Sequence, residues 1–154
     1  MKEKSKEDYM RLALAQAKRG QAADEVPVGA VIVLGGKVIA RAYNRKETLG
    51  RCTAHAEILA IEKAEKKLGT WHLDGAEMYV TLEPCPMCAG AIAGARISRL
   101  YFGAYEPKSG SAASRFPILT ESGLNHRTEF EGGVLEESCA TLLKNYFKSK
   151  RKEK

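Results

Sequence analysis

The chain has 154 residues, short enough for one domain yet long enough to bury roughly two-thirds of its unfolded surface. Hydrophobic residues make up 44% and charged residues 29%, which excludes collagen-like, low-complexity and wholly disordered classes. No apolar run approaches the ~18 residues that span a bilayer, and the first ten residues lack the apolar stretch of a secretory signal. We therefore expect one domain over residues 1–154, cytoplasmic and without membrane contact.

Hydrophobic periodicity predicts helices where apolar residues recur every three to four positions, and strands where β-branched runs are flanked by turn residues. In chain order, the predicted elements are a helix over 6–19 that stops at Gly20, strands over 28–34 and 37–43, a helix capped by Thr53 and closed by Gly69, a strand over 77–82, a helix over 86–95, strands over 98–102 and 128–131, and a helix from about Leu135. Residues 105–124 are predicted to form a long loop of the functional kind. This order implies a three-layer α/β/α domain with a five-stranded mixed sheet.

The net charge of +6 is concentrated at the two ends of the chain. Residues 141–154 carry a net charge of +5 and residues 1–20 a net charge of +3, so the middle of the chain is slightly acidic. Clustered cations attract polyanions and make binding salt-dependent. A solvated helix end, favoured by the helix dipole, explains the basic end from about Lys144 equally well at this point.

Two short motifs, each at a predicted helix start, hold the residues that can do chemistry: His55-Ala56-Glu57 and Pro84-Cys85-Pro86-Met87-Cys88. One imidazole and two thiolates give three ligands for a zinc ion and leave its fourth tetrahedral position open for water, as in catalytic sites. Pro86 suits the first position of a helix with Cys85 as its N-cap, where the helix dipole favours thiolates.

Glu57 follows His55 by two positions, and residues two apart do not stack on one helix face. Glu57 is therefore predicted to lie beside the metal rather than on it. A carboxylate in that place can take a proton from zinc-activated water and hand it to a leaving nitrogen. The chemistry implied is hydrolytic removal of an amine.

Each of these residues also has a structural interpretation. A closed structural zinc site needs a fourth protein ligand, and the candidates are Cys52, His72 and His126, of which Cys52 is the nearest in sequence. Glu57 without zinc is an ordinary first-turn carboxylate. Cys139 lies on the apolar stripe of the last helix, as a core residue does. His126 fits either an RNA contact or a structural hydrogen bond, and Trp71 fits packing or surface.

His-x-Glu followed by Pro-Cys-x-x-Cys is the signature by which zinc deaminases are recognised. The chain resembles the zinc-dependent cytidine/deoxycytidylate deaminase family along nearly its whole length, and within it the bacterial tRNA-specific adenosine deaminases. The resembling segments are 25–30 (EVPVGA), 55–57 (HAE), 81–91 (TLEPCPMCAGA) and 125–127 (NHR).

The resemblance implies a cytidine-deaminase-like fold, a cytoplasmic homodimer, and conversion of adenosine to inosine at the wobble position of a tRNA anticodon loop. It implies that one Zn²⁺ per subunit is held by His55, Cys85 and Cys88, and that Glu57 is the catalytic proton shuttle. Substrate contacts are implied for Asn44, Val28, Glu83 and Pro84. An asparagine amide can pair with an adenine edge, and an apolar side chain such as Val28 can shield the base. A purely structural role for Asn44, as the residue that ends the second strand, fits the sequence equally well.

The sequence departs from the family at Arg51-Cys52, where Asp-Pro is usual, and at Glu106, where Asp is usual.

An alternative function is deamination of a free nucleobase or nucleoside, such as guanine or cytosine, and a non-enzymatic one is RNA binding with structural zinc. A steep salt dependence separates RNA substrates from small neutral ones. Retention of zinc on removal of Cys52 separates an open site from a closed one.

Overall fold

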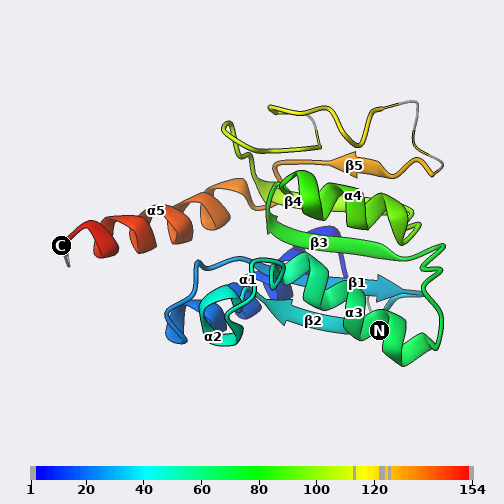
Figure 1. Cartoon of the computed structure of the whole chain (residues 1–154), viewed down its shortest axis with the longest axis horizontal. Helices are drawn as coiled ribbons and strands as arrows, with labels where there is room; N and C mark the ends of the chain where they lie inside the picture. The colour runs from blue at the N-terminus through cyan, green and yellow to red at the C-terminus, as the bar shows by residue number, and fades with distance from the viewer. Residues whose placement is uncertain (1–2, 113, 122–123, 125, 153–154) are drawn as a thin grey trace.

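The computed structural model describes residues 3–112, 114–121, 124 and 126–152, so Asn125 and the end of the basic tail lie outside the described residues. Within them the chain forms a five-stranded sheet in the order β2-β1-β3-β4-β5 (Figure 1). The strands are β1 (Gly29–Leu34), β2 (Lys37–Tyr43), β3 (Glu77–Leu82), β4 (Arg99–Ala104) and β5 (Glu129–Glu131). β1 pairs antiparallel with β2 and β3, whereas β3, β4 and β5 run parallel, which confirms the predicted mixed sheet.

Helices cover both faces of this sheet. They are α1 (Lys6–Ala22), α2 (Lys46–Leu49), α3 (Ala56–Leu68), α4 (Pro86–Gly94) and α5 (Glu136–Lys152). Figure 1 shows α3 and α4 side by side in front of the sheet, α1 behind it, and α5, which follows β5 and packs against β4, projecting beyond the sheet. No helix in the described part of the chain is both long enough and apolar enough to cross a bilayer.

The alternation of side chains along the strands builds two apolar layers. On one face the Tyr79 ring stacks on Tyr101 at a centroid distance of 4.6 Å and lies 5.1 Å from the ring of Tyr9 in α1. The neighbouring positions Val80 and Phe102 therefore point to the opposite face, and both are fully buried. The core thus lies on both sides of the sheet, as expected for a three-layer domain.

Two glycines permit close packing of helices on the sheet. A Cβ added to Gly29 would overlap the main chain of α1 at Ala13, so α1 lies directly against β1. A Cβ added to Gly103 would overlap the side chain of Cys139, so α5 begins directly against β4. Cys139 is 1% exposed, which confirms it as a core residue.

Most element boundaries agree with the predictions to within one or two residues, and the clearest differences are at the end of α1, after β2 and at the start of α3. The first helix continues through Gly20 to Ala22, because Gly20 packs against the Tyr43 ring, from which an added Cβ would be 3.3 Å away. The polar segment after β2 contains the short helix α2. Thr53 is not a helix cap, since α3 starts at Ala56 with His55 in the N-cap position.

Candidate active site

The starts of α3 and α4 bring the two motifs together. His55 and Cys85 are the N-cap residues of these helices, both with extended backbone, and Pro86 occupies the first turn of α4 as predicted. His55 Nδ1 lies 3.7 Å from Cys85 Sγ and 3.5 Å from Cys88 Sγ. The three potential ligand atoms all lie within 4.8 Å of one another. Residues 30 or more positions apart thus form one compact donor cluster.

The spacing of these donors fits a tetrahedral zinc ion. With Zn–S of about 2.3 Å and Zn–N of about 2.0 to 2.1 Å, tetrahedral angles place sulfur and nitrogen roughly 3.5 to 3.6 Å apart. The two observed Nδ1 to Sγ distances bracket that value. Cys52, His72 and His126 are described and belong to no such cluster, and the Cys52 side chain is exposed. The structure therefore offers the open three-ligand arrangement rather than a closed one.

The two thiols differ in protonation because they contact each other. A hydrogen bond from Cys88, with a further one from His55, lowers the pKa of Cys85 to about 4. The same contact raises the pKa of Cys88, and burial raises it further. The hydrogen bond to Cys85 also raises the pKa of His55. One thiolate is therefore already favoured at neutral pH, which suits a metal ligand.

Glu57 is buried beside the cluster, in the first turn of α3, with 3% of its surface exposed. Burial raises its pKa to about 7, against the lowering effects of its backbone hydrogen bond and of His55. The Glu57 carboxyl and the Cys88 thiol lie close enough for each to shift the pKa of the other. A carboxyl group that exchanges its proton near neutral pH is suited to general acid and base catalysis.

Asn44 is a cap for α3 supplied from outside the helix. Its side-chain Oδ1 accepts a hydrogen bond of 2.7 Å from the backbone N–H of Ala56, the first residue of α3. Its own backbone N–H donates to Val28 O, beyond the end of β2. With Oδ1 already used, the side-chain NH₂ of Asn44 is the group available to a ligand. Sequence reasoning predicted a local cap at Thr53 and missed this one.

A cavity of about 200 Å³ opens in front of the cluster. It is lined by Val26, Val28, Asn44, Lys46, His55, Glu57, Leu82, Glu83, Cys85, Glu106 and Ser109. Pro84 is not among these residues; it is buried, and its carbonyl accepts from the N–H of Ser111. The cavity is small beside the ~300–1,000 Å³ of drug-sized pockets, so it has room for a single base.

Two buried carboxylates hold the walls of this cavity. Glu83 accepts hydrogen bonds from the backbone N–H groups of Glu106, Ala112 and Ser114 and from the Ser114 hydroxyl. Glu25 accepts from the N–H groups of Glu47 and Thr48 and from the Thr48 hydroxyl, at the start of α2. Both are 2% exposed. A buried carboxylate must find hydrogen-bond donors. A glutamate next to an apolar run is therefore the sequence feature that could have predicted these two loop-holding residues.

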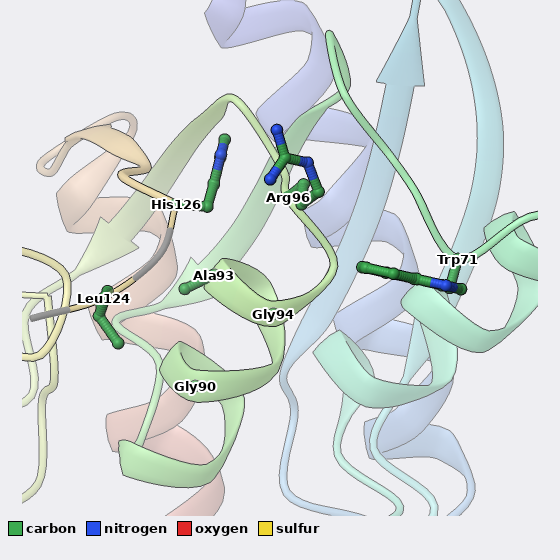
Figure 2. Close-up of a pocket in the computed structure, with 7 residues that line it drawn as sticks. All are labelled: Trp71, Gly90, Ala93, Gly94, Arg96, Leu124 and His126. Carbon is green, nitrogen blue, oxygen red and sulfur yellow. The ribbon is translucent and has the colours of Figure 1, made fainter.

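A separate cavity of about 300 Å³ lies on the outer face of α4 (Figure 2). Figure 2 shows Trp71 and His126 on opposite sides of the small residues Gly90, Ala93 and Gly94. Trp71 is 56% exposed and stacks on His72. His126 Nε2 donates to the carbonyl of Ile97 at 2.9 Å, which corresponds to the structural one of the two interpretations that the sequence left open.

Comparison with known proteins places these features in a family. A model of the MafB19-like deaminase family matches residues 4–151. The chain is 49% identical over 146 residues to the tRNA-specific adenosine deaminase of Bacillus subtilis, covering 95% of this chain and 91% of that protein. It is 47% identical over 143 residues to the tRNA-specific adenosine deaminase of Agrobacterium fabrum, covering 93% and 94%.

Solved structures agree with this. One from work on A-to-I editing by tRNA deaminases acting at the wobble position has a TM-score of 0.85 at 47% identity, covering 88% of this chain and 98% of that one. A guanine deaminase from Nitrosomonas europaea has a TM-score of 0.79 at 28% identity, covering 92% and 84%. The sheet, its helices and the His/Cys/Cys cluster are therefore those of the cytidine-deaminase-like fold. The chain belongs to the MafB19-like deaminase family and, at these identities, to the family of the tRNA-specific adenosine deaminases.

Proposed function

We propose that this protein hydrolytically deaminates adenosine to inosine at the wobble position of a tRNA anticodon loop. The observation that carries the proposal is the donor cluster of His55, Cys85 and Cys88, at tetrahedral spacing and with buried Glu57 beside it, facing a cavity for one base. These three residues would hold one Zn²⁺ per subunit. Zinc bound there supplies Lewis-acid chemistry, since it lowers the pKa of water to about 7.

Glu57 moves the protons of the reaction. As a carboxylate it takes a proton from the attacking water, and as an acid it delivers that proton to the ring nitrogen next to C6. Glu57 then takes the proton of the new hydroxyl on C6 and passes it to the departing amino group, so ammonia leaves and a carbonyl oxygen remains on C6. Its burial keeps bulk water from competing for the proton.

The cavity recognises the base through one polar donor and an apolar wall. The NH₂ of Asn44 donates to a purine ring nitrogen, while its Oδ1 stays on Ala56 and fixes the amide orientation. Val28 and Leu82 shield the base from water. A cavity this small admits a base extruded from its strand, not a stacked nucleotide. Glu83 acts on the substrate through the loop that it holds.

The basic C-terminal half of α5 is the RNA contact in this proposal. Lys144, Lys148, Arg151 and Lys152 recur every three to four positions and are all exposed, so they share one helix face. A stripe of cations favours a polyanion such as an anticodon stem-loop. Transfer RNA is a cytoplasmic substrate, and we place the activity there.

We further propose that the protein is a homodimer that pairs through the outer face of α3 and α4. Three large apolar side chains on or next to these helices are exposed, namely Leu68 at the end of α3, Trp71 after it and Met87 at the start of α4. The small residues Gly90, Ala93 and Gly94 of α4, which line a cavity together with Trp71 (Figure 2), permit a close approach of a second copy. Sedimentation of the wild type and of Trp71→Glu tests this, since a monomeric wild type contradicts it.

The activity is tested with zinc-loaded protein and an anticodon stem-loop that carries adenosine at the wobble position. We expect ammonia release and inosine at that one position, with free adenosine, guanine and cytosine inert. Glu57→Ala should keep its zinc but lose turnover. Cys52→Ala should also keep its zinc. An active Glu57→Ala enzyme contradicts the mechanism, and turnover of a free base with an untouched stem-loop contradicts the substrate.

A further inference from the structure

Another cavity, of about 300 Å³, opens at the edge of the sheet where β2 is the outermost strand. It is lined by Gln16 and Arg19 of α1, Arg41, Ala42 and Tyr43 of β2, Arg45, and Leu59 and Lys63 of α3. Four of these residues are cations and none is a carboxylate. The cavity belongs to neither of the surfaces assigned above.

Two of the cations are held in place by local contacts. Lys63 Nζ donates a hydrogen bond of 2.7 Å to the main-chain oxygen of Arg41, which fixes the ammonium group at the strand edge. The guanidinium of Arg19 lies over the Tyr43 ring, 5.5 Å from its centroid. The cationic groups are therefore partly organised before any ligand arrives.

The positive charge of this cavity is not balanced by an ion pair. Of the salt bridges that the described residues form, none includes Arg19, Arg41, Arg45 or Lys63. The charge of Arg45 lowers the pKa of the nearby Glu25, but these two described residues form no salt bridge, and the Glu25 oxygens already accept three hydrogen bonds at the start of α2.

The cations also lie close enough to repel one another. The pKa of Lys63 is lowered, first by burial and then by the charges of Arg45 and Arg19. Like charges gathered in a partly buried place are unfavourable unless an anion joins them. A bound anion would relieve this repulsion.

We propose that Arg19, Arg41, Arg45 and Lys63 form a phosphate-binding site, which takes either a backbone phosphate of an RNA or a free phosphate ion. Arginine forks suit phosphate oxygens, and the lysine adds a point charge. In the chain, Arg45 stands between Asn44 and Lys46, and both of these neighbours line the catalytic cavity. A strand whose base enters that cavity therefore passes its neighbouring phosphate toward Arg45. The RNA form of this inference rests on the proposed function, and the free-phosphate form does not.

The competing explanation is protection of an edge strand. Basic side chains on an outermost strand discourage pairing with other chains. That role predicts no effect on RNA or phosphate, so binding measurements separate the two.

The test compares Arg41→Gln/Lys63→Gln with Lys66→Gln/Lys67→Gln, a control that removes two exposed charges of α3 outside the cavity. Both pairs are made in zinc-loaded protein carrying Glu57→Ala, so that the RNA is not consumed. Binding of the anticodon stem-loop is measured between 50 and 200 mM salt. Each phosphate contact to a single strand contributes about 0.7 to the slope of log Kd against log salt. Because the site takes one phosphate, the cavity variant should lose about 0.7 of slope, so its affinity falls about 2.6-fold less over this range, and the control should lose less.

A second experiment uses inorganic phosphate alone. It measures how much higher the Tm of each protein is in phosphate than in chloride at the same ionic strength. A smaller slope in the cavity variant alone supports the site with RNA as the source. Loss of the phosphate-dependent rise in the cavity variant alone, with an unchanged slope, supports it with free phosphate as the source. If the Glu57→Ala protein with an intact cavity does not bind the stem-loop, the proposed function fails. The measurement with inorganic phosphate then decides alone whether the cavity is a phosphate site. If neither slope nor Tm response differs from the control, the proposal is overturned.

Discussion

Replacement of Glu83 by glutamine tests the inference that a buried carboxylate holds one wall of the catalytic cavity. Oε1 accepts from the N–H of Glu106 at 3.1 Å and from the Ser114 hydroxyl, and Oε2 accepts from the N–H of Ala112 at 3.2 Å and of Ser114 at 2.9 Å. Glutamine keeps the shape of the side chain but has one acceptor oxygen. If the NH₂ group faces Ala112 and Ser114, both of their N–H groups lose their acceptor; if it faces Glu106 and the Ser114 hydroxyl, the hydroxyl can turn to accept and only the N–H of Glu106 is left without a partner.

The size of the effect follows from these contacts. A buried donor left without a partner costs about 1–3 kcal/mol, and this is the cost of the better amide orientation if the loop stays in place. Because the loop lies at the surface, its N–H groups can instead turn to water. We therefore expect Glu83→Gln to open the loop and displace Glu106 and Ser109 from the cavity wall. At the lower bound of about 1 kcal/mol, kcat/KM should fall roughly 5-fold.

Hydrogen exchange of residues 106–112, zinc content and kcat/KM together measure this outcome. We expect faster exchange and lower kcat/KM with unchanged zinc in Glu83→Gln, a smaller change in Ser114→Ala, and no change in Glu62→Gln, which alters an exposed carboxylate of α3. Wild-type exchange together with wild-type kcat/KM in Glu83→Gln would refute the reasoning. Loss of zinc would show that Glu83 acts through the donor cluster instead.

Two further predictions concern stability. Gly103→Ala should lower the free energy of unfolding by about 1–3 kcal/mol, because the new Cβ overlaps Cys139 Sγ and lies 2.9 Å from Thr81 O; urea unfolding measures this, and Cys139→Ala should restore part of the loss. At Glu25, burial raises the pKa, but hydrogen bonds from Thr48 and Glu47 outweigh it and hold the pKa below its ordinary value of 4.5. Its contribution to stability is therefore complete above that value and is lost as the pH falls through the lower pKa of the folded state. Glu25→Gln should be less stable than the wild type at pH 7, with the gap closing below about pH 4. A gap of equal size at both pH values contradicts this.

The two motifs of the donor cluster can be identified from the sequence because the spacing within each motif is local, whereas the fold brings His55 to Cys85 and Cys88. Pro86 favours the first turn of a helix and leaves Cys85 as the N-cap, and three positions later Cys88 returns to the same side. His55 and Glu57 lie two apart at the start of the next motif, which separates a ligand from its neighbouring carboxylate. The alternation of apolar runs likewise predicts the mixed sheet and the strand 77–82 without any distant contact.

The walls of the catalytic cavity depend on contacts that no local pattern predicts. Asn44 caps α3 from 12 residues away, and Glu83 binds a loop 23 to 31 residues further along the chain. Arg19 and Lys63 meet at the edge of β2 from two different helices. Local propensity determines which backbone forms a helix or a strand, because its energy depends on neighbouring residues. The partner of a buried polar group is set by packing instead, since each such group must find a donor or acceptor among whatever the folded chain brings beside it.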